Sequence, residues 1–487
     1  QLLAGPGTGA GGARRAGMDA AADLLDRLGC PDGLIACTDA DSRPARDWLA
    51  RQLAHVEAGA QAIAGVIELH PDEARRLPPA VIRRRTREAA VRLQRVRERD
   101  PQASHHHFAG ASLGITAAAY RAVGGLEPLA ALEDAAFADR LAAHGIAVLR
   151  ASDVVVSTSA RSAGRTRRGL SVDLAVSAWG ERRRYTAEQF SPRQLSAQKG
   201  DTSVVVVIPT KECAETIDGV LRGTVEPLAA HGLVDEVVVV DAASRDGTAG
   251  LAAAHGARVL QQDEALNAFG PALGKGDAMW RAVHETSGEV ICFLDGDTAD
   301  SEPRHLLGLL GPLLSDDSVD LVKGAFERPL RAGEVELANE GGRVTELMAR
   351  PLLNLHEPLL AGFAQPLAGE FAGRRELFES IAFPVGYGVE IAVLIDALRA
   401  CGLDALAECH LGTRRNRHQS LRSLGEMAYA VLAAVERRLG TRTSPLGGHY
   451  LRPWDDFSVA QVPIAERPPL RSLDGHGDSR PKALAKD

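Results

Sequence analysis

The sequence has no long hydrophobic run, and it carries no excess of positive charge. Its longest unbroken apolar stretches are short, such as Val204–Ile208, whereas a membrane-spanning helix needs about 20 apolar residues. We therefore expect no membrane span. The 56 Lys and Arg residues stand against 64 Asp and Glu residues, a net charge of −8. This balance argues against a nucleic-acid-binding protein that works through bulk charge.

Closely spaced cysteine pairs are also absent. The six cysteines are scattered along the chain, and none belongs to a C-x-x-C motif, which excludes a zinc knuckle and a thioredoxin motif. Six cysteines are too few for a disulfide scaffold in 487 residues. We expect buried free thiols in the reducing cytoplasm, since no signal peptide is visible. Residue 1 is Gln, which leaves open that the chain begins inside a longer protein.

The composition that is present is that of a globular protein, with 45% hydrophobic and 25% charged residues. A chain of 487 residues is long enough for two or more domains. We expect a partial α/β domain over 1–160, a linker rich in Arg, Ser and Gly over 161–200, a complete α/β domain over 201–440, and a C-terminal extension over 441–487.

The region 201–440 alternates predicted strands and helices. Strands are expected at 203–208, 235–240, 257–261 and 289–294, with helices between them. This alternation predicts a parallel, doubly wound sheet, in which ligands bind at the carboxyl ends of the strands. The polar residues that follow these strands are therefore candidates for the site: Pro209, Thr210, Lys211 and Glu212, then Asp241 and Ser244, then Asp295 and Asp297.

Asp295 and Asp297 form a D-x-D turn after a buried strand. Two carboxylates on such a turn suit Mg²⁺ or Mn²⁺, which would neutralise the charge of a departing diphosphate. Lys275 stands between two glycines at the start of a predicted helix and can reach a phosphate. As a D-x-D turn alone is common, the polar residues of the neighbouring strands carry much of this argument.

Three further groups are candidates. Gly342, Arg343 and Thr345 begin a predicted helix and form a plausible site for the phosphate of an acceptor. Glu390 lies in an apolar stretch, where a carboxylate without a partner is costly. The basic stretch 414–418 contains a potential metal ligand. For each group, an ordinary structural role is the alternative: a plain helix start, a core ion pair and a solvated loop.

The region 1–160 repeats part of this plan. A predicted strand at 33–38 is followed by Asp39 and Asp41, and a helix begins at Glu133 and Asp134. A strand followed by D-x-D in both regions suggests a duplication. The counterparts of the first strands and their nucleotide loops either precede Gln1 or are lost.

At this point the sequence resembles a known family. The stretch from about 203 to 470 resembles the glucosyl-3-phosphoglycerate synthases, which are retaining glycosyltransferases of the GT-A fold. The resemblance rests on VVVVIPTKE, DAASRDGT, LGKGDAMWRA, FLDGDTAD, LVKGAFERPL, GGRVTELMARPLL, QPLAGEF and FPVGYGVEIAVLIDAL. It implies a Rossmann-like, mostly parallel sheet. Residues 1–170 resemble more loosely the back half of a GT2-type glycosyltransferase, through LIACTDADSRPARDWL, FAGASLGITAAAYRAVGGL and LEDAAFADRL.

The resemblance implies a role for each candidate. Glu390 would hold the sugar or the acceptor hydroxyl near the anomeric carbon, and Lys275 would approach the donor diphosphate. Asp295 and Asp297 would contact the ribose and the metal. The nucleotide site would be lined by Pro209, Thr210, Lys211, Glu212, Asp241 and Ser244, and the phosphoglycerate would be bound by Gly342, Arg343, Thr345 and Asn416. In the first module, Asp39 and Asp41 would bind a metal, and Asp134 would be the general base.

One stretch departs from the family pattern. The family has a metal-binding histidine in R-E-H-R-N-R, where this chain has Thr413-Arg414-Arg415-Asn416-Arg417-His418. An ungapped alignment places Asn416 at the histidine, and alignment of the R-N-R triplets places Arg414 there. His418, two residues beyond Asn416, is our candidate for the missing metal ligand, and His410 lies shortly before it.

The predicted function is therefore transfer of glucose from a nucleoside-diphosphate sugar, with UDP-glucose favoured, to 3-phosphoglycerate with retention. The alternatives are a mannosyl-3-phosphoglycerate synthase, an inverting transferase to a polyprenyl phosphate, which the lack of membrane anchors disfavours, and a non-catalytic tandem that binds nucleotide sugars. The expected partners are the nucleotide sugar and a phosphorylated small acid, with no nucleic acid. A homodimer is left open.

Overall fold

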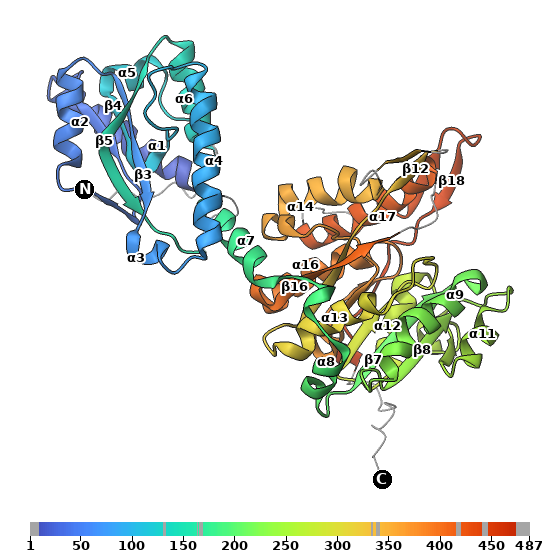
Figure 1. Ribbon diagram of the computed structural model, residues 1–487. Coiled ribbons are helices and arrows are strands. Elements are labelled where there is room, and N and C mark those ends of the chain that lie inside the picture. Colours follow the sequence, from blue (N-terminus) through green and yellow to red (C-terminus); the bar gives the residue numbers. More distant parts are fainter. Residues whose placement is uncertain are drawn as a thin grey trace. The chain divides into compact units, whose positions relative to one another are not determined.

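The computed structural model describes residues 9–129, 133–162, 164, 169–332, 335–337, 341–414, 420–440 and 447–473. The chain divides into two compact units, Gln1–Glu181 and Arg182–Asp487 (Figure 1). The predicted linker 161–200 holds two helices, α7 (Leu170–Arg183) and α8 (Pro192–Lys199), and the short strand β6 (Arg184–Thr186). No helix among the described residues is long and apolar enough to cross a bilayer.

The second unit contains an eight-stranded sheet in the order β6-β16-β11-β14-β10-β7-β8-β9. All of its pairs are parallel except those that β14 makes with β10 and β11. The predicted strands are confirmed. The bounds are β7 (Val204–Thr210), β8 (Glu236–Asp241), β9 (Arg258–Gln261), β10 (Val290–Phe293), β11 (Leu321–Glu327), β14 (Phe371–Arg374) and β16 (Leu406–Thr413).

Helices connect these strands. They are α9 (Ala214–Val220), α10 (Glu226–Ala229), α11 (Thr248–Ala254), α12 (Lys275–Glu285), α13 (Pro303–Ser315), α14 (Arg350–His356), α15 (Arg375–Ser380), α16 (Val389–Cys401) and α17 (Leu421–Leu439), with the π-helical turns η3 (Leu221–Val225) and η5 (Thr345–Ala349). Three two-stranded pairs complete the unit: β12 (Leu330–Ala332) with β13 (Val335–Leu337), β15 (Phe383–Pro384) with β19 (Glu466–Arg467), and β17 (His449–Arg452) with β18 (Ser458–Gln461).

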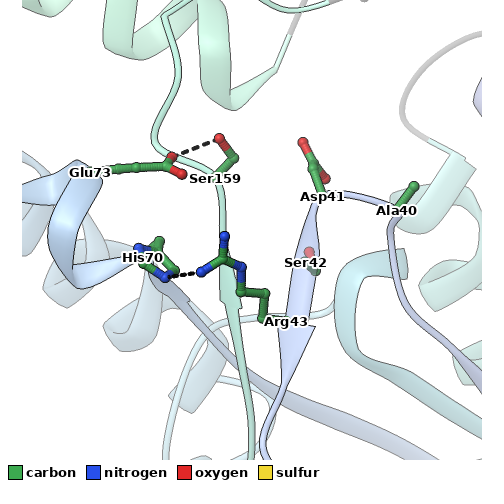
Figure 2. A pocket seen from close by; sticks show the side chains of 7 residues that line it. All are labelled: Ala40, Asp41, Ser42, Arg43, His70, Glu73 and Ser159. Carbon is green, nitrogen blue, oxygen red and sulfur yellow. Dashed lines mark hydrogen bonds between the residues drawn. The ribbon is translucent and has the colours of Figure 1, made fainter.

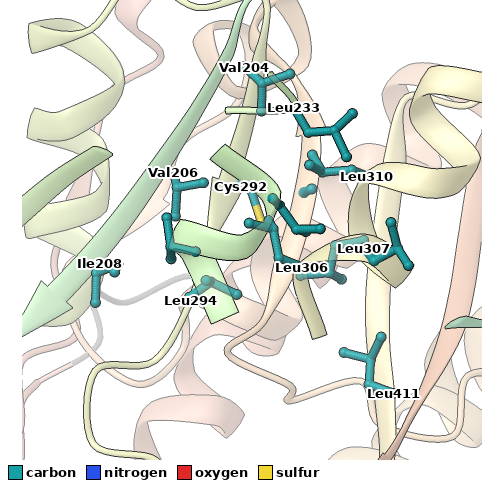
Figure 3. Close-up of a cluster of buried hydrophobic side chains, with 14 of the residues drawn as sticks. Val204, Val206, Ile208, Leu233, Cys292, Leu294, Leu306, Leu307, Leu310 and Leu411 are labelled. Carbon is teal, nitrogen blue, oxygen red and sulfur yellow. The ribbon is translucent and has the colours of Figure 1, made fainter. Parts of the chain in front are cut away.

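The core of the second unit packs the sheet against α13 and its neighbouring helices. Val204, Val206 and Ile208 alternate along β7 and are fully buried, since their side chains share one face of the strand. Leu306 and Leu310, one helical turn apart on α13, meet this face (Figure 3). Burial of apolar surface stabilises this packing by about 25 cal/mol per Å². The packed strands form the scaffold whose ends carry the polar groups of the site.

The first unit contains a five-stranded sheet in the order β1-β4-β3-β5-β2. Its strands are β1 (Leu34–Cys37), β2 (Ser42–Pro44), β3 (Ala62–Leu69), β4 (Leu113–Thr116) and β5 (Val148–Thr158). Its helices are α1 (Gly9–Arg27), α2 (Trp48–Glu57), α3 (Pro71–Ala74), α4 (Pro79–Arg97), α5 (Ala117–Ala122) and α6 (Glu133–Ala143). The strand predicted at 33–38 and the helix predicted to begin at Glu133 are confirmed in this unit, as β1 and α6.

The two sheets share a sequence of strands. In the first unit β1, β4, β3 and β5 lie side by side with antiparallel, antiparallel and parallel pairing. In the second unit β10, β14, β11 and β16 have the same order and directions. Within the described residues, the first sheet has no counterparts of β7, β8 and β9.

All six cysteines are free thiols. Cys213, Cys292 and Cys409 are buried, as predicted, whereas Cys37 and Cys401 are partly buried and Cys30 is exposed. The prediction of burial is thus wrong for Cys30. It lies in the turn between α1 and β1, where the chain runs over the surface.

Candidate active site

Three charged side chains meet at the carboxyl ends of the second sheet. Lys275 is the first residue of α12, Asp295 follows β10 by two residues, and Glu390 is the second residue of α16. The Lys275 Nζ donates to Asp295 Oδ1 at 2.6 Å and to Glu390 Oε1 at 3.0 Å. We call these three residues the lysine cluster. Segments 115 residues apart in the chain are thereby joined at one point.

The lysine cluster is a strongly coupled set of charges. Burial opposes protonation of Lys275, but Asp295 and Glu390 outweigh burial, so the pKa of Lys275 is raised. Burial pushes the pKa of Asp295 upward, and Lys275 more than offsets this effect, so that pKa is lowered. Burial and the negative charge of Asp295 together raise the pKa of the neighbouring Asp297. The site thus presents a fixed cation beside one carboxylate, Asp297, that would gain from a positive neighbour.

Two residues that received no role from the sequence lie against this cluster. A Cβ on Gly369 would come within 2.4 Å of Asp295 Oδ1 and 2.5 Å of Lys275 Nζ, so any larger residue there would displace these charged groups. Lys323, on β11, is fully buried. Its Nζ donates to the Ala368 carbonyl at 2.6 Å and lies 4.5 Å from the centre of the Phe371 ring. Burial lowers the pKa of Lys323 to about 8.

Helix α12, which carries Lys275, is tied to the C-terminal segment. Asp277 is fully buried, and its carboxylate accepts from Arg281 Nε at 3.1 Å and from Arg467 Nη2 at 2.6 Å. Burial favours the neutral acid, but Arg467 and Arg281 outweigh it, so the pKa of Asp277 is lowered. The Trp280 Nε1 donates to the Pro468 carbonyl at 2.8 Å. These contacts fix the start of α12.

The loops after β7 and β8 brace each other. Asp241 is buried, and its carboxylate accepts from the Thr210 hydroxyl at 3.3 Å, the Ser244 backbone at 3.0 Å and the Gln261 amide at 3.3 Å. The Ser244 hydroxyl accepts from the Glu212 backbone at 2.8 Å. The predicted donor-binding residues Thr210, Glu212, Asp241 and Ser244 therefore lie in one hydrogen-bonded group.

Two residues in these loops have an unusual backbone. Glu212 has φ 52° and Ala243 has φ 54°, in the left-handed region that costs a non-glycine residue energy. The Glu212 carboxylate accepts from the Arg245 backbone at 3.0 Å, which helps to hold this conformation. Pro209 is partly buried and Lys211 is exposed beside them, so the loops offer both rigid backbone and a cation to a ligand.

The predicted acceptor residues begin a continuous helical stretch formed by η5 and α14. Gly342 has φ +69°, a conformation that favours glycine. The Gly341 backbone donates to the Arg328 carbonyl at 2.8 Å, which anchors the turn. Thr345 is buried and Arg343 is partly exposed. Since η5 is π-helical, its backbone is wider than an α-helix, a feature frequent at functional sites.

Of the two residues that the alignments place at the family's metal-binding histidine, Arg414 and Asn416, only Arg414 lies within the described residues. Arg414 is buried and forms an ion pair with Glu370. It also donates to the Asp300 carbonyl at 2.8 Å and to His305 Nδ1 at 2.9 Å. A guanidinium has no lone pair for a metal, so Arg414 is not a ligand. Asn416 and His418 lie outside the described residues, and within the described ranges no group of three His, Cys, Asp or Glu residues is placed to hold a metal.

The first unit also brings its predicted residues together. Arg14, on α1, donates to Asp39 Oδ1 at 2.7 Å and to Asp134 Oδ1 at 3.2 Å, and it pairs with Glu133. We call Arg14, Asp39, Glu133 and Asp134 the arginine cluster. Burial and Glu133 outweigh Arg14, so the pKa of Asp134 is raised. Asp41 is not part of this cluster, because it turns to Arg161 at 2.8 Å.

A sequence model of glycosyl transferase family 2 matches residues 205–352. The chain is 44% identical over 282 residues to a glucosyl-3-phosphoglycerate synthase of Mycolicibacterium smegmatis, covering 57% of this chain and 92% of that protein. It is 40% identical over 289 residues to the Mycobacterium tuberculosis synthase, covering 58% of this chain and 89% of that protein. The chain belongs to the glucosyl-3-phosphoglycerate synthase family.

Solved structures agree with this assignment to the glucosyl-3-phosphoglycerate synthase family. A mannosyl-3-phosphoglycerate synthase of Rubrobacter xylanophilus is similar at 42% identity and a TM-score of 0.56, covering 61% of this chain and 99% of that chain. The M. tuberculosis glucosyl-3-phosphoglycerate synthase, solved with Mn²⁺, UDP and phosphoglyceric acid, is similar at 38% identity and a TM-score of 0.52, covering 58% of this chain and 95% of that chain. The predicted GT-A fold, with its mostly parallel sheet, is confirmed.

Sequence reasoning missed Lys323 and Gly369, which lie beside the lysine cluster, and Arg14 of the arginine cluster. A lysine inside the apolar strand LVKGAF was the available signal for Lys323, since an isolated buried charge is costly. Gly369 gave no signal by itself, because its role is to make room for side chains from distant segments. Arg14 lies 25 residues before Asp39 and 119 before Glu133, so no local pattern connects them.

Proposed function

We propose that this chain transfers glucose from UDP-glucose to the 2-hydroxyl of 3-phosphoglycerate, with retention at the anomeric carbon. The observation that carries the proposal is the lysine cluster, in which a partly buried cation and two carboxylates meet at the carboxyl ends of the strands. Membership of the glucosyl-3-phosphoglycerate synthase family supports the choice of substrates. The relative from M. tuberculosis is solved with UDP-glucose and phosphoglyceric acid.

On the donor side, the loops after β7 and β8 would hold the nucleoside. Thr210, Glu212, Asp241 and Ser244 are mutually hydrogen-bonded, with Pro209 and Lys211 beside them. A rigid loop loses little conformational entropy when it binds a base and ribose. The Lys275 ammonium would approach the diphosphate, where its positive charge stabilises the leaving group. Because Asp295 and Glu390 already hold Nζ in place, little reorganisation is needed.

On the acceptor side, Arg343, Gly342 and the helix start at Thr345 would bind the phosphate of 3-phosphoglycerate. Glu390 would orient the acceptor hydroxyl or the sugar near the anomeric carbon. In this proposal Glu390 positions and does not attack, and a diphosphate oxygen of the donor takes the hydroxyl proton. Asn416, predicted on the acceptor side, belongs to the undescribed segment after Arg414.

Asp297 fits a divalent cation, because burial of its carboxyl and the nearby charge of Asp295 raise its pKa, and a cation would offset both effects. Asp297 would hold Mg²⁺ or Mn²⁺, with His418 as the predicted second protein ligand, and the cation would neutralise charge on the departing diphosphate. The relative from M. tuberculosis is solved with Mn²⁺.

The test is an assay of the full chain with UDP-glucose, 3-phosphoglycerate and Mn²⁺, measuring UDP release and the anomeric configuration of the product by NMR. We expect UDP release that needs all three components and stops with EDTA, and an axial glycosidic bond. An equatorial bond would contradict retention. UDP release without 3-phosphoglycerate would indicate donor hydrolysis and contradict the proposed acceptor.

Mannosyl transfer is the second candidate, since the structure of the R. xylanophilus mannosyl-3-phosphoglycerate synthase is similar to this chain at 42% identity. GDP-mannose in place of UDP-glucose separates the two. Faster turnover with GDP-mannose would favour the mannosyl enzyme. If no donor releases nucleotide, the non-catalytic tandem is the better description.

A further inference from the structure

The first unit carries charged groups on the same elements as the second. The arginine cluster joins a helix, the turn after β1 and the start of α6, as the lysine cluster joins α12, the turn after β10 and the start of α16. The cation precedes its aspartate by 25 residues in the first unit and by 20 in the second. It precedes the acid on the later helix by 119 and 115 residues, respectively. The arrangement of the second unit's site is thus repeated in the first.

A pocket of about 220 Å³ opens beside the turn that carries Asp39 (Figure 2). Its polar lining follows three strands of the sheet: Asp41, Ser42 and Arg43 after β1, His70 and Glu73 after β3, and Ser159 after β5. The counterparts of these strands are β10, β11 and β16. The pocket therefore lies where the second unit presents its candidate active site.

The carboxylates of this pocket are already satisfied. Asp41 lies 2.8 Å from the guanidinium of Arg161. Glu73 Oε2 accepts from the Ser159 hydroxyl and from the Ala160 backbone, each at 2.7 Å. Arg161 therefore offsets the charge of Asp41, whereas Ser159 and the Ala160 backbone hold the Glu73 carboxylate in place without neutralising it.

The cationic side of the pocket keeps donors available. Arg43 Nη1 donates to His70 Nε2 at 2.5 Å. Figure 2 shows the Arg43 guanidinium at the centre of the group. Because a guanidinium only donates, Nε2 accepts, and the ring proton of neutral His70 lies on Nδ1. In the described part of the chain this buried Nδ1 has no hydrogen-bond partner, and Arg43 has no carboxylate partner. The Arg43 guanidinium, without a carboxylate partner, suits an anion.

The size of the pocket limits the ligand. Sites for drug-sized molecules occupy roughly 300–1,000 Å³, more than the 220 Å³ found here. The described sheet of the first unit also lacks counterparts of β8 and β9, and the end of β8 carries part of the predicted nucleotide site in the second unit. The pocket therefore suits a small acid and not a nucleotide sugar.

We propose that the first unit binds a small phosphorylated or carboxylated acid, of about three carbons, in this pocket, with the Arg43 guanidinium, which His70 holds in place, as its hydrogen-bond donor. This site is separate from the glucosyl-transfer site of the second unit. It extends the chain from one small-acid site to two.

The proposal is tested by hydrogen–deuterium exchange of the full chain, read peptide by peptide, with 3-phosphoglycerate, D-glycerate or glycerol. We expect either acid to slow exchange at least about threefold in peptides covering 40–46, 68–76 and 156–162, whereas glycerol does not. The phosphate-containing probe and the carboxylate-only probe distinguish which anion the site prefers. Peptides of the second unit report separately on the proposed function.

Arg43→Gln should abolish the protection of the first unit and keep that of the second. Arg46→Gln is the matched control, an exposed arginine three residues away outside the pocket lining. Unchanged exchange in β3 shows that each variant is folded. The proposal is overturned if neither acid protects these peptides at concentrations up to 10 times those that protect the second unit, if glycerol protects them equally, or if Arg43→Gln retains the protection.

Discussion

The arginine cluster and the lysine cluster place a cation on equivalent elements of the two units, but they differ in how the cation is used. Lys275 faces two carboxylates and is the point charge of an open site. Arg14 bridges three carboxylates with its planar fork, which leaves few donors for a ligand. The difference shows that one arrangement of strands can hold either a lysine between two carboxylates or an arginine that bridges three.

In both units a glycine lies directly against the cationic side chain. A Cβ on Gly369 would meet Lys275 Nζ at 2.5 Å, and a Cβ on Gly110 would meet the Arg14 guanidinium carbon at 2.0 Å. Both glycines shortly precede the antiparallel strand of their sheet, β14 or β4. The backbone there must approach the charged group closely, so the steric requirement is common to the two units while the chemistry is not.

We expect the largest effect from replacing Lys275, the cation of the second unit. Lys275→Met removes the charge beside the diphosphate, and we expect kcat for UDP release to fall by about 10³-fold. Steady-state kinetics with UDP-glucose and 3-phosphoglycerate measure it. Arg222→Met, an exposed arginine paired only with Asp218 one helical turn away, serves as the control. A Lys275→Met enzyme within tenfold of the wild type would remove this lysine from the transfer step.

Arg14→Met tests the structural side of the comparison. Three partly buried carboxylates lose their counter-charge, so we expect the first unit to lose about 3 kcal/mol of stability. Calorimetry with hydrogen exchange of β1 and β4 measures this loss. Arg121→Gln breaks only exposed pairs and should cost less than about 1 kcal/mol. Because protonation removes the repulsion, the deficit of Arg14→Met should shrink as the pH falls. A deficit equal at pH 4 and pH 7 would contradict the charge explanation.

The two sheets also differ at one equivalent position, which is occupied by Lys323 in the second unit and by Ala64 in the first. Lys323 pairs with Phe371 in register, and Ala64 pairs with Leu113 at the equivalent place of the first unit. The folded pKa of Lys323, about 8, lies below its ordinary value, so the unfolded chain binds more protons between about pH 8 and 10.5. Stability from this group therefore rises with pH across that window.

We expect the wild type to gain up to about 3 kcal/mol relative to Lys323→Met between these pH values. Urea unfolding at a series of pH values measures the difference. Parallel pH profiles for the two proteins would show that Lys323 is not held neutral by its surroundings.

The smallest effect concerns the proposed acceptor side, where the units also differ. After β11 the second unit has the turn that carries Gly342 and Arg343, whereas after β3 the first has the short helix α3. Arg343→Ala should raise the KM for 3-phosphoglycerate about tenfold, with less than a twofold change in the KM for UDP-glucose. Arg222→Ala should change neither. Equal increases in both KM values would take Arg343 out of the acceptor site.

The sequence predicted the strands and the residues at their ends, because buried β-branched runs such as Val204–Ile208 are unambiguous and parallel strands end at one edge. It also pointed to Lys275, Asp295 and Glu390. What it did not predict depends on contacts between distant segments. The pairing of Asp241 with both Thr210 and Ser244 and the closed bridge at Arg14 arise only once the sheet has formed.

The tie between α12 and the C-terminal segment has a consequence for how the protein is made. Asp277 lies two positions after Lys275, the first residue of α12. Its partner Arg467 lies 190 residues further along the chain. During synthesis, every strand of the second sheet leaves the ribosome before this arginine does. A nascent chain can therefore complete its sheet while the helix that presents Lys275 still lacks its clamp, and this support for Lys275 forms only after Arg467 has been synthesised.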